Sequence, residues 1–296
     1  MALESFISYL SLEKHYSEHT VNAYKKDIGS FIDFCARRHG SGAIDGVSYS
    51  VIRTWVVDLV ESGISNRTIN RKMAALKAYY KFLQGIGGIS VNPLAKHKAL
   101  KTAKKIEVPF SEKEMEDALF QVDFSDDFEG VRDRLVIELF YTTGIRRAEL
   151  VNLKLYDVDL PARSIKVLGK RNKERIVPLL RSTVDLFSQY FVKREALPKV
   201  SDEAYVFLLK SGDKIYETLV YRLINKYFSK VSSKVKKSPH ILRHTFATHM
   251  LNKGADINSV KELLGHASLA STQVYTHNGI AELKKVHAKA HPRAKK

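Results

Sequence analysis

The sequence predicts a mainly α-helical protein of two domains: a four-helix N-terminal domain and a C-terminal domain that combines helices with a small antiparallel β-sheet. The chain has 296 residues, more than one compact core usually accommodates. Apolar residues recur at helical spacing over most of it, and one short stretch alternates as strands do. A polar, lysine-rich segment separates the two regions, so we expect domains at 1–86 and 110–296 joined by a linker at 87–109.

The N-terminal region predicts four helices. The first covers about 3–14, the second begins near Ser17, the third covers about 50–61 and the fourth follows Ser65. The second helix carries an apolar stripe with spacings of three and four residues, formed by Val21, Tyr24, Ile28, Phe31 and Phe34. This spacing indicates that each helix buries one face.

The C-terminal region begins with a capping box, in which Ser111 and Glu114 have the spacing of a helix N-terminus. A long apolar helix is expected over 127–143. The stretches 164–168 and 175–179 flank a basic tip and predict a β-hairpin, and 205–209 is a candidate further strand. Helix is expected over most of the remaining chain, with a frayed, basic tail at its end.

The charge balance favours a polyanionic partner. Lys and Arg number 49 against 32 Asp and Glu, giving a net charge of +17, and nucleic acid is the first candidate. The alternative is a solvated basic surface with no dedicated ligand. Candidate DNA-binding side chains lie on the fourth helix, in the linker and at the hairpin tip: Arg67, Arg71, Lys72, Lys77, Lys101, Lys104, Lys105, Arg171 and Lys173. A basic linker between basic domains suggests a clamp around a duplex.

Several protein classes are disfavoured by missing features. The single cysteine, Cys35, cannot form an internal disulfide or a Cys-based zinc cluster, and no signal peptide is evident, so we expect a cytoplasmic protein. No membrane insertion is expected, because apolar runs are interrupted by charge too early to span a bilayer. No P-loop and no His-Glu-x-x-His motif occur, and we expect no cofactor and no metal.

The residues that remain for chemistry are cations and one phenol. His240 and Arg243 lie three apart at a helix start, so one phosphate could contact both. Alternatively, both are simply exposed on a helix whose other face is core. Arg146 follows a helix end at Gly144, where its planar guanidinium suits a phosphate, or it pairs with Glu149, which could orient it.

Three further residues complete the set of candidates. Lys170 lies at the hairpin tip, where it could protonate a leaving alkoxide or simply be solvated. His266 and Tyr275 lie close together near the C-terminus. A phenol has an ordinary pKa near 10 and becomes a nucleophile only beside bases or cations. Alone, Tyr275 would be an ordinary helix tyrosine; the joint pattern is what favours a nucleophile.

The motifs that carry these residues closely resemble the tyrosine recombinase (phage integrase) family, Xer branch. They read T-G-I-R-R-A-E-L, G-K-x-N-K-E-R, H-I-L-R-H-T-F-A-T-H, L-G-H-A-S and T-Q-V-Y-T-H. The resemblance covers nearly the whole chain. It extends to an N-terminal core-binding (SAM-like) domain at 16–24 and 71–83, and to the Asn92-Pro93-Leu94 and His291-Pro292-Arg293-Ala294 segments.

This resemblance implies a catalytic set of Arg146, Lys170, His240, Arg243, His266 and Tyr275. Tyr275 would be the nucleophile that forms a 3′-phosphotyrosyl link to DNA, and Lys170 the general acid toward the 5′-oxygen. Arg171 stands where many relatives have glycine, so we expect a differently shaped hairpin tip, with Lys173 as the alternative to Lys170.

The resemblance also implies partners. These are double-stranded DNA at a specific site, and a homo- or hetero-tetramer in which each C-terminal helix, here about 279–289, docks on a neighbour. A paralogous recombinase and a septal DNA translocase belong to the same expectation, as does resolution of chromosome dimers. Two alternatives are an integrase of a mobile element, disfavoured by the short N-terminal region, and an inactive DNA-binding relative, disfavoured because all six side chains are present.

Overall fold

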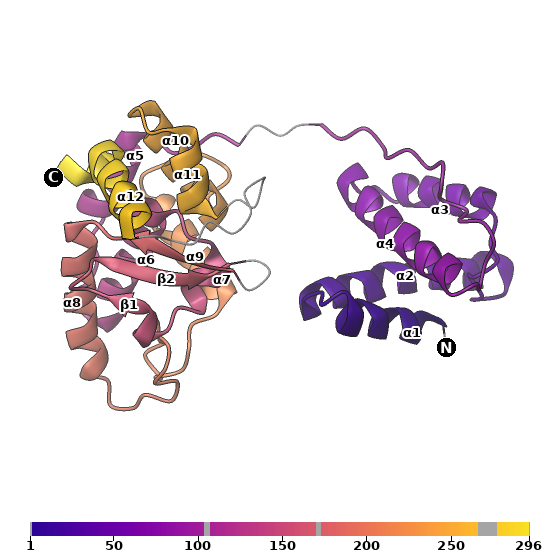
Figure 1. Cartoon of the computed structure of the whole chain (residues 1–296), viewed down its shortest axis with the longest axis horizontal. Helices are drawn as coiled ribbons and strands as arrows, with labels where there is room; N and C mark the ends of the chain where they lie inside the picture. Colours follow the sequence, from indigo (N-terminus) through magenta and orange to yellow (C-terminus); the bar gives the residue numbers. More distant parts are fainter. Residues whose placement is uncertain (1, 104–106, 170–172, 266–276, 296) are drawn as a thin grey trace. The chain divides into compact units, whose positions relative to one another are not determined.

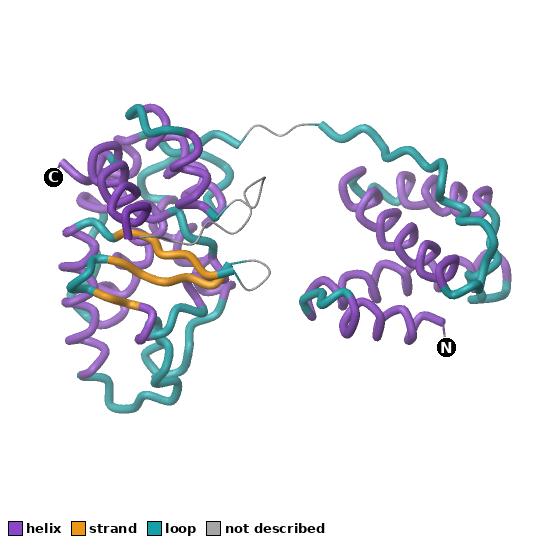
Figure 2. The backbone as a smooth tube through the Cα atoms, in the orientation of Figure 1, coloured by secondary structure: helices purple, strands orange, loops and turns teal. Residues whose placement is uncertain are grey.

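The computed structural model describes residues 2–103, 107–169, 173–265 and 277–295. The chain forms two compact units, Met1–Lys105 and Ile106–Lys296. Both units are built mainly from helices, and the described residues of the second contain a three-stranded antiparallel sheet (Figures 1 and 2). The predicted fold class, mainly helical with a small antiparallel sheet, is confirmed.

The first unit contains the four predicted helices. They are α1 (Ala2–Ser8), continued by the π-helical turn η1 (Tyr9–Glu13), then α2 (Glu18–His39), α3 (Tyr49–Glu61) and α4 (Asn66–Gly85). Serine caps begin two of them, because Ser17 Oγ accepts the amide of Thr20 and Ser65 Oγ accepts that of Thr68. The apolar stripes of the helices pack into one core around Phe31, Trp55 and Tyr80.

The segment after α4 packs against the first unit as far as its last described residues. Leu94 is fully buried there. The Asn70 side chain holds Leu100 twice, donating to its carbonyl at 2.9 Å and accepting its amide at 2.8 Å. On the other side of the unit boundary, Phe110 is fully buried and its amide donates to Thr245 Oγ1 at 2.9 Å. Much of the lysine-rich segment is therefore anchored to one unit or the other.

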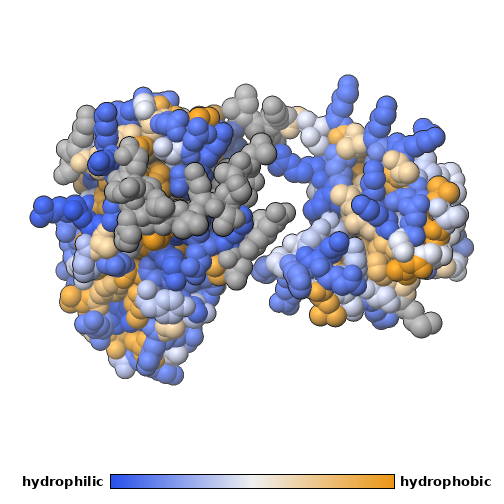
Figure 3. Space-filling model, in the orientation of Figure 1, coloured by the Kyte–Doolittle hydropathy of each residue, from blue (hydrophilic) through white to orange (hydrophobic). Residues whose placement is uncertain are grey.

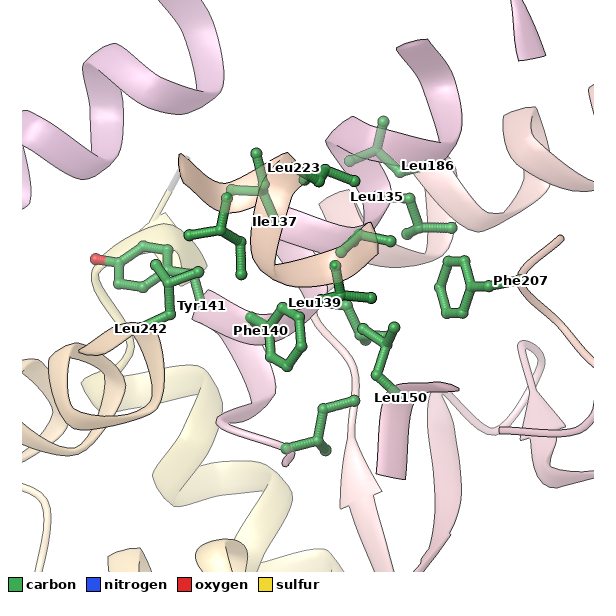
Figure 4. Close-up of a cluster of buried hydrophobic side chains, with 14 of the residues drawn as sticks. Leu135, Ile137, Leu139, Phe140, Tyr141, Leu150, Leu186, Phe207, Leu223 and Leu242 are labelled. Carbon is green, nitrogen blue, oxygen red and sulfur yellow. The ribbon is translucent and has the colours of Figure 1, made fainter. Parts of the chain in front are cut away.

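The second unit is organised around α6, which is buried on nearly every side. Its labelled side chains, including Leu135, Ile137 and Phe140, point in several directions into the core (Figure 4). Most of its residues are buried, and the charged ones among them pair inside the protein. Besides the sheet, the described part of the second unit contains α5 (Glu112–Glu116), η2 (Asp117–Gln121), α6 (Phe128–Thr143), α7 (Arg147–Val151), η3 (Leu155–Asp157), α8 (Arg181–Glu195), α9 (Glu217–Phe228), α10 (Pro239–Asn252), α11 (Ile257–Leu264), α12 (His277–Ala290) and η5 (Pro292–Lys295).

Local signals in this unit were interpreted correctly. The capping box is formed, because Ser111 Oγ accepts the amide of Glu114 at 3.1 Å and the Glu114 carboxylate accepts that of Ser111 at 2.7 Å. The predicted hairpin is formed by β2 (Ser164–Leu168) and β3 (Glu174–Pro178). A two-residue strand that the sequence analysis missed, β1 (Val158–Asp159), pairs with β2 and gives the order β1-β2-β3.

The candidate strand at 205–209 is wrong. Only isolated bridges form there, between Lys154 and Tyr205 and between Leu208 and Lys214. The backbone amides find partners in separate segments: Val206 donates to the Leu153 carbonyl, and Leu208 to the Tyr190 hydroxyl. The apolar run is buried as irregular chain because, among the described residues, no neighbouring strand offers it a continuous ladder.

The C-terminal tail is docked on its own domain, and the expectation of a frayed tail is wrong. After α12, Arg293 is buried, donates to the Glu138 carboxylate at 2.8 Å and lies 4.6 Å from the centre of the Phe120 ring. The buried carboxylate of α6 requires a cationic partner, and the tail supplies it. The described part of the tail therefore packs on its own domain.

Two buried histidines join α12 to the C-terminal end of α6. His287 Nε2 donates to the Thr142 carbonyl at 2.6 Å, and His291 Nε2 donates to the Tyr141 carbonyl at 3.0 Å. The last carbonyls of a helix have no partner within it, so these histidines satisfy groups that α6 leaves open. His291 Nδ1 also accepts the amide of Arg293, which requires a neutral ring.

Acid is expected to weaken this docking. Burial lowers the pKa of His287 to about 4 and, with the neighbouring His287, Arg293 and His249 charges, lowers the pKa of His291 well below its usual value. The unfolded chain binds protons from about pH 6.5 downward, whereas the folded chain resists them. The stabilisation is complete above pH 6.5 and is lost as the pH falls below it, by about 2 kcal/mol for His287 at pH 5.

Thermal unfolding at pH 7.5, 6.0 and 5.0 measures this loss. The control is the double variant His287→Gln/His291→Gln, since a glutamine amide still donates to a carbonyl but does not titrate. We expect the wild type to lose stability more steeply than this variant. Parallel pH profiles for the two proteins would contradict the assignment.

Candidate active site

Arg146 lies at the turn that joins α6 to α7. α6 ends at Thr143, its C-cap residue Gly144 has a left-handed φ of 62°, and Arg146 is the N-cap residue of α7. Its amide donates to Glu149 Oε2 and its Nη1 to Glu149 Oε1, both at 2.7 Å. Its Nη2 donates to the Gly265 carbonyl at 3.1 Å. The predicted pairing with Glu149 is therefore present, and the Arg146 side chain is still 35% exposed, so its guanidinium remains accessible from solvent.

Gly144 is required at this turn for two reasons. Its φ is unfavourable for residues with a Cβ, and a Cβ would clash with the Phe246 ring and lie 2.8 Å from Leu264 Cδ2. We expect Gly144→Ala to destabilise the protein by about 2–4 kcal/mol. Chemical denaturation measures this, with Gly40→Ala as the control: Gly40 also has a positive φ but nothing within 4 Å of its Cβ. Equal losses in both variants would show that the turn is not crowded.

Arg243 reaches the same turn from α10 and is buried. Its Nη1 donates to the Gly144 carbonyl and its Nη2 to the Leu264 carbonyl, both at 2.6 Å. The alternative that Arg243 is merely exposed is therefore wrong. His240 lies one turn earlier on α10 and is exposed, just after the Ser238 cap and Pro239. The structure thus brings Arg146 and Arg243 together from segments almost one hundred residues apart.

The sequence analysis missed one member of this cluster, Arg175 on β3. It is buried, and its Nη1 and Nη2 donate to the two carboxylate oxygens of Glu149 at 2.8 Å each. Its Nε donates to the Leu263 carbonyl at 2.9 Å. A signal was present: Arg175 and Val177 share one strand face by alternation, so an arginine occupies a position that faces the core.

Three arginines bind three successive carbonyls at the end of α11. The Leu263 carbonyl accepts from Arg175, that of Leu264 from Arg243 and that of Gly265 from Arg146. These carbonyls lie at the negative end of the helix dipole and have no amide partner within the helix itself. The arginine cluster, defined as Arg146, Arg175 and Arg243, therefore holds the point where the chain leaves α11.

The arginine cluster carries an excess of positive charge around Glu149. Burial, with the neighbouring Arg146 and Arg175 charges, lowers the pKa of Arg243 to about 10. Burial alone would raise the pKa of Glu149, but hydrogen bonds and charge from Arg175 and Arg146 hold it at about 2. At neutral pH three guanidinium groups thus face one carboxylate, a net charge of 3 − 1 = +2. This arrangement suits an anionic group such as a phosphate.

Several predicted site residues lie outside the described residues: Lys170, His266, Tyr275, Lys104, Lys105 and Arg171. The chain on either side of them is described. Gly265, whose carbonyl accepts from Arg146, directly precedes His266 in the sequence. At the base of the hairpin, the Gly169 amide donates to the Lys173 carbonyl at 2.7 Å, and Lys173 is exposed.

The predicted DNA-binding residues of the first unit differ in their surroundings. Arg67, Lys77 and Lys101 are exposed. Lys72 is not: its Nζ lies 3.6 Å from the buried Asp27 carboxylate and 5.6 Å from the centre of the Trp55 ring, and its side chain is 13% exposed. Arg71 also contacts Asp27 but keeps half of its side chain exposed. The face drawn in Figure 3 is largely hydrophilic over both units.

The described residues form neither a metal-ligand cluster nor a membrane-spanning helix. Among the described residues, no three His, Cys, Asp or Glu side chains lie together as a metal site would require. In the same part of the chain, no helix has the length and apolar character needed to cross a bilayer.

Comparison with known proteins identifies the family. Residues 110–282 match the model of the phage integrase family, and residues 3–85 match that of its N-terminal SAM-like domain. The chain belongs to the phage integrase family of tyrosine recombinases. This recombinase is 37% identical to tyrosine recombinase XerC of Chlorobaculum parvum, covering 99% of this chain and 94% of the relative. It is 39% identical to XerC of Anoxybacillus flavithermus, covering 99% and 98%.

Solved structures share the fold of the recombinase. The XerH site-specific recombinase in a post-cleavage complex with its difH substrate superposes with a TM-score of 0.72 at 21% identity, covering 97% of this chain and 83% of that one. A λ integrase dimer bound to a core site gives 0.66 at 16%, covering 92% and 98%. The family match and the identity to the XerC relatives show that the protein is a tyrosine-type site-specific recombinase, an enzyme that cleaves and rejoins DNA strands.

Proposed function

We propose that the recombinase cleaves and rejoins DNA at a specific recombination site, using Tyr275 as its nucleophile. The observation that carries the proposal is the arginine cluster at the end of α11. Arg146 and Arg243 converge there and give the site a net positive charge. Gly265, whose carbonyl Arg146 binds, lies one residue before His266 and ten before Tyr275 in the sequence. Arginines arranged in this way can hold the non-bridging oxygens of a phosphodiester as its charge grows in the transition state.

The chemistry is proposed by analogy with the family to which the chain belongs. Tyr275 Oη attacks the phosphorus, the bond to the 5′-oxygen breaks, and a 3′-phosphotyrosyl link forms. His240 assists removal of the phenol proton, Lys170 supplies the proton that the 5′-oxygen takes up, and His266 hydrogen-bonds the phosphate. The bond energy is kept in the covalent link. The 5′-hydroxyl of a second strand then reverses the step, and two rounds proceed through a Holliday junction.

The biological role is proposed by analogy with the relatives named XerC. It is resolution of chromosome or plasmid dimers in the cytoplasm, by a tetramer that can include a paralogous recombinase and respond to a septal DNA translocase. Domains at 1–86 and 110–296, joined at 87–109, would hold the duplex as a clamp. The exposed Arg67, Lys77, Lys101 and Lys173 support this arrangement, and the XerH and λ integrase structures are complexes with their DNA sites.

The test is a nicked suicide duplex that carries the recombination site of the host's chromosomal terminus. Cleavage releases a short fragment, so religation stops and the covalent adduct accumulates. We expect an adduct whose DNA-linked peptide, found by mass spectrometry, contains Tyr275. An adduct on another residue would contradict the assignment, and no adduct on the cognate site would contradict the proposed activity.

Salt is expected to weaken DNA binding steeply. Phosphate contacts release counterions, so the logarithm of the affinity should fall with a slope of roughly −0.9 per phosphate neutralised. Titrations at several salt concentrations measure the slope. The double variant Arg67→Gln/Lys77→Gln should reduce it by about two, because both side chains are exposed on α4. An unchanged slope in this variant would show that these two side chains of α4 do not contact DNA phosphates.

A further inference from the structure

Arg175 occupies a position from which it can act on the reaction only through other residues. Its side chain is 4% exposed. All three of its nitrogens donate within the protein: two to Glu149 and one to the Leu263 carbonyl. A phosphate in the solvent-facing part of the site cannot reach these donors. Any role of Arg175 in catalysis must therefore pass through Glu149 or the end of α11.

Glu149 is shared between two arginines with different exposure. Its Oε1 accepts from Arg146 Nη1 at 2.7 Å and from Arg175 Nη1 at 2.8 Å, and its Oε2 accepts the Arg146 amide and Arg175 Nη2. A carboxylate and a guanidinium pair best as two parallel bonds. Arg175 takes that bidentate geometry, which leaves Arg146 a single side-chain bond to Glu149.

We infer that Arg175 is a positioning residue for strand cleavage. By engaging both oxygens of Glu149, it prevents Glu149 from closing a bidentate pair with Arg146, so the Arg146 fork stays turned toward the phosphate. Its bond to the Leu263 carbonyl also fixes the helix end from which the chain continues to His266. The inference rests on the proposed function, because it assumes that Arg146 binds the scissile phosphate.

The lysine variant separates this role from a general structural one. Arg175→Lys keeps a buried cation but loses the planar fork, so one oxygen of Glu149 becomes available to Arg146. We expect the single-turnover cleavage rate on the suicide duplex to fall about 10- to 100-fold, with DNA affinity unchanged. The matched control is Arg194→Lys. Arg194 is buried on α8 and donates to the Glu203 and Tyr205 carbonyls, so its variant should cleave at the wild-type rate.

A double-mutant cycle supplies the readout that a structural role would not move. If Arg175 acts through Arg146, then Arg175→Lys should cost less than about threefold in an Arg146→Lys background, because the fork it protects is already gone. Glu149→Gln tests the same link without changing Arg175. The loss of cleavage rate that it causes should also be smaller in the Arg146→Lys background. Circular dichroism of each variant at the assay temperature verifies that it is folded.

The outcomes are distinct. A wild-type adduct with equal rate losses in both backgrounds would overturn the positioning role and leave the proposed function intact. A wild-type cleavage rate for Arg175→Lys would do the same. If the wild type forms no adduct with the duplex, or Tyr275→Phe still forms one, the proposed function fails and the inference fails with it.

Discussion

Tyr275→Phe is expected to form no covalent adduct with the suicide duplex. The rate of adduct formation should fall by about 10⁴-fold or more, as is typical when a covalent nucleophile is removed. The phenyl ring keeps its size and loses only the oxygen that attacks the phosphorus. DNA affinity should stay at the wild-type value, because it comes mainly from phosphate contacts of basic residues elsewhere. Gel separation of the adduct and a binding titration measure the two quantities.

Another tyrosine serves as the control for this variant. Tyr221 lies on α9 and is 45% exposed, so Tyr221→Phe removes a hydroxyl from the surface of the same domain. It should cleave at the wild-type rate. If the adduct still forms in Tyr275→Phe but not in Tyr221→Phe, the nucleophile is Tyr221 and the assignment of Tyr275 is wrong.

Arg243→Gln is expected to lower the cleavage rate by about 10²- to 10³-fold while changing stability little. The loss of rate follows because the arginine cluster would lose one of its charges on the phosphate. The small effect on stability has two opposing causes. The carbonyls of Gly144 and Leu264 lose hydrogen bonds, but burial and the repulsion from Arg146 and Arg175, which lower the pKa of Arg243, are relieved. Single-turnover cleavage and chemical denaturation measure both effects.

Arg132→Gln should show the opposite pattern. Arg132 is as buried as Arg243, but its Nη2 lies 2.7 Å from the carboxylate of the buried Asp133. Removing it leaves a buried acid without its cationic partner, which typically costs about 3–5 kcal/mol. Cleavage per folded molecule should be retained. If Arg243→Gln instead loses as much stability as Arg132→Gln and cleaves at the normal rate, Arg243 is a structural residue.

Local features of the fold were predictable because their causes lie within a few residues. The caps at Ser17, Ser65 and Ser111 formed as predicted, since each serine accepts an amide three residues later. The hairpin formed because its two strands alternate on either side of a basic tip. The family could also be identified, because its motifs are contiguous in the sequence.

Features that depend on distant partners were not predictable. The run at 205–209 has the composition of a strand, but the segments beside it offer no continuous ladder. The basic tail reads as solvated until Glu138, more than 150 residues earlier, is seen to pair with Arg293. Lys72 reads as a free cation until Asp27 and Trp55 are placed beside it.

The sequence by itself determined the helical class, the family and the residue types that the chemistry requires. Only the tertiary structure decided how the described members of the site support one another. Glu149 is a bridge rather than a competitor, Arg175 belongs to the cluster, and three arginines hold the end of α11. The physical reason is that helix periodicity and motifs are properties of neighbouring residues. A buried charge is stabilised by whichever partners the fold brings to it, and those partners lie on β3, α7 and α10.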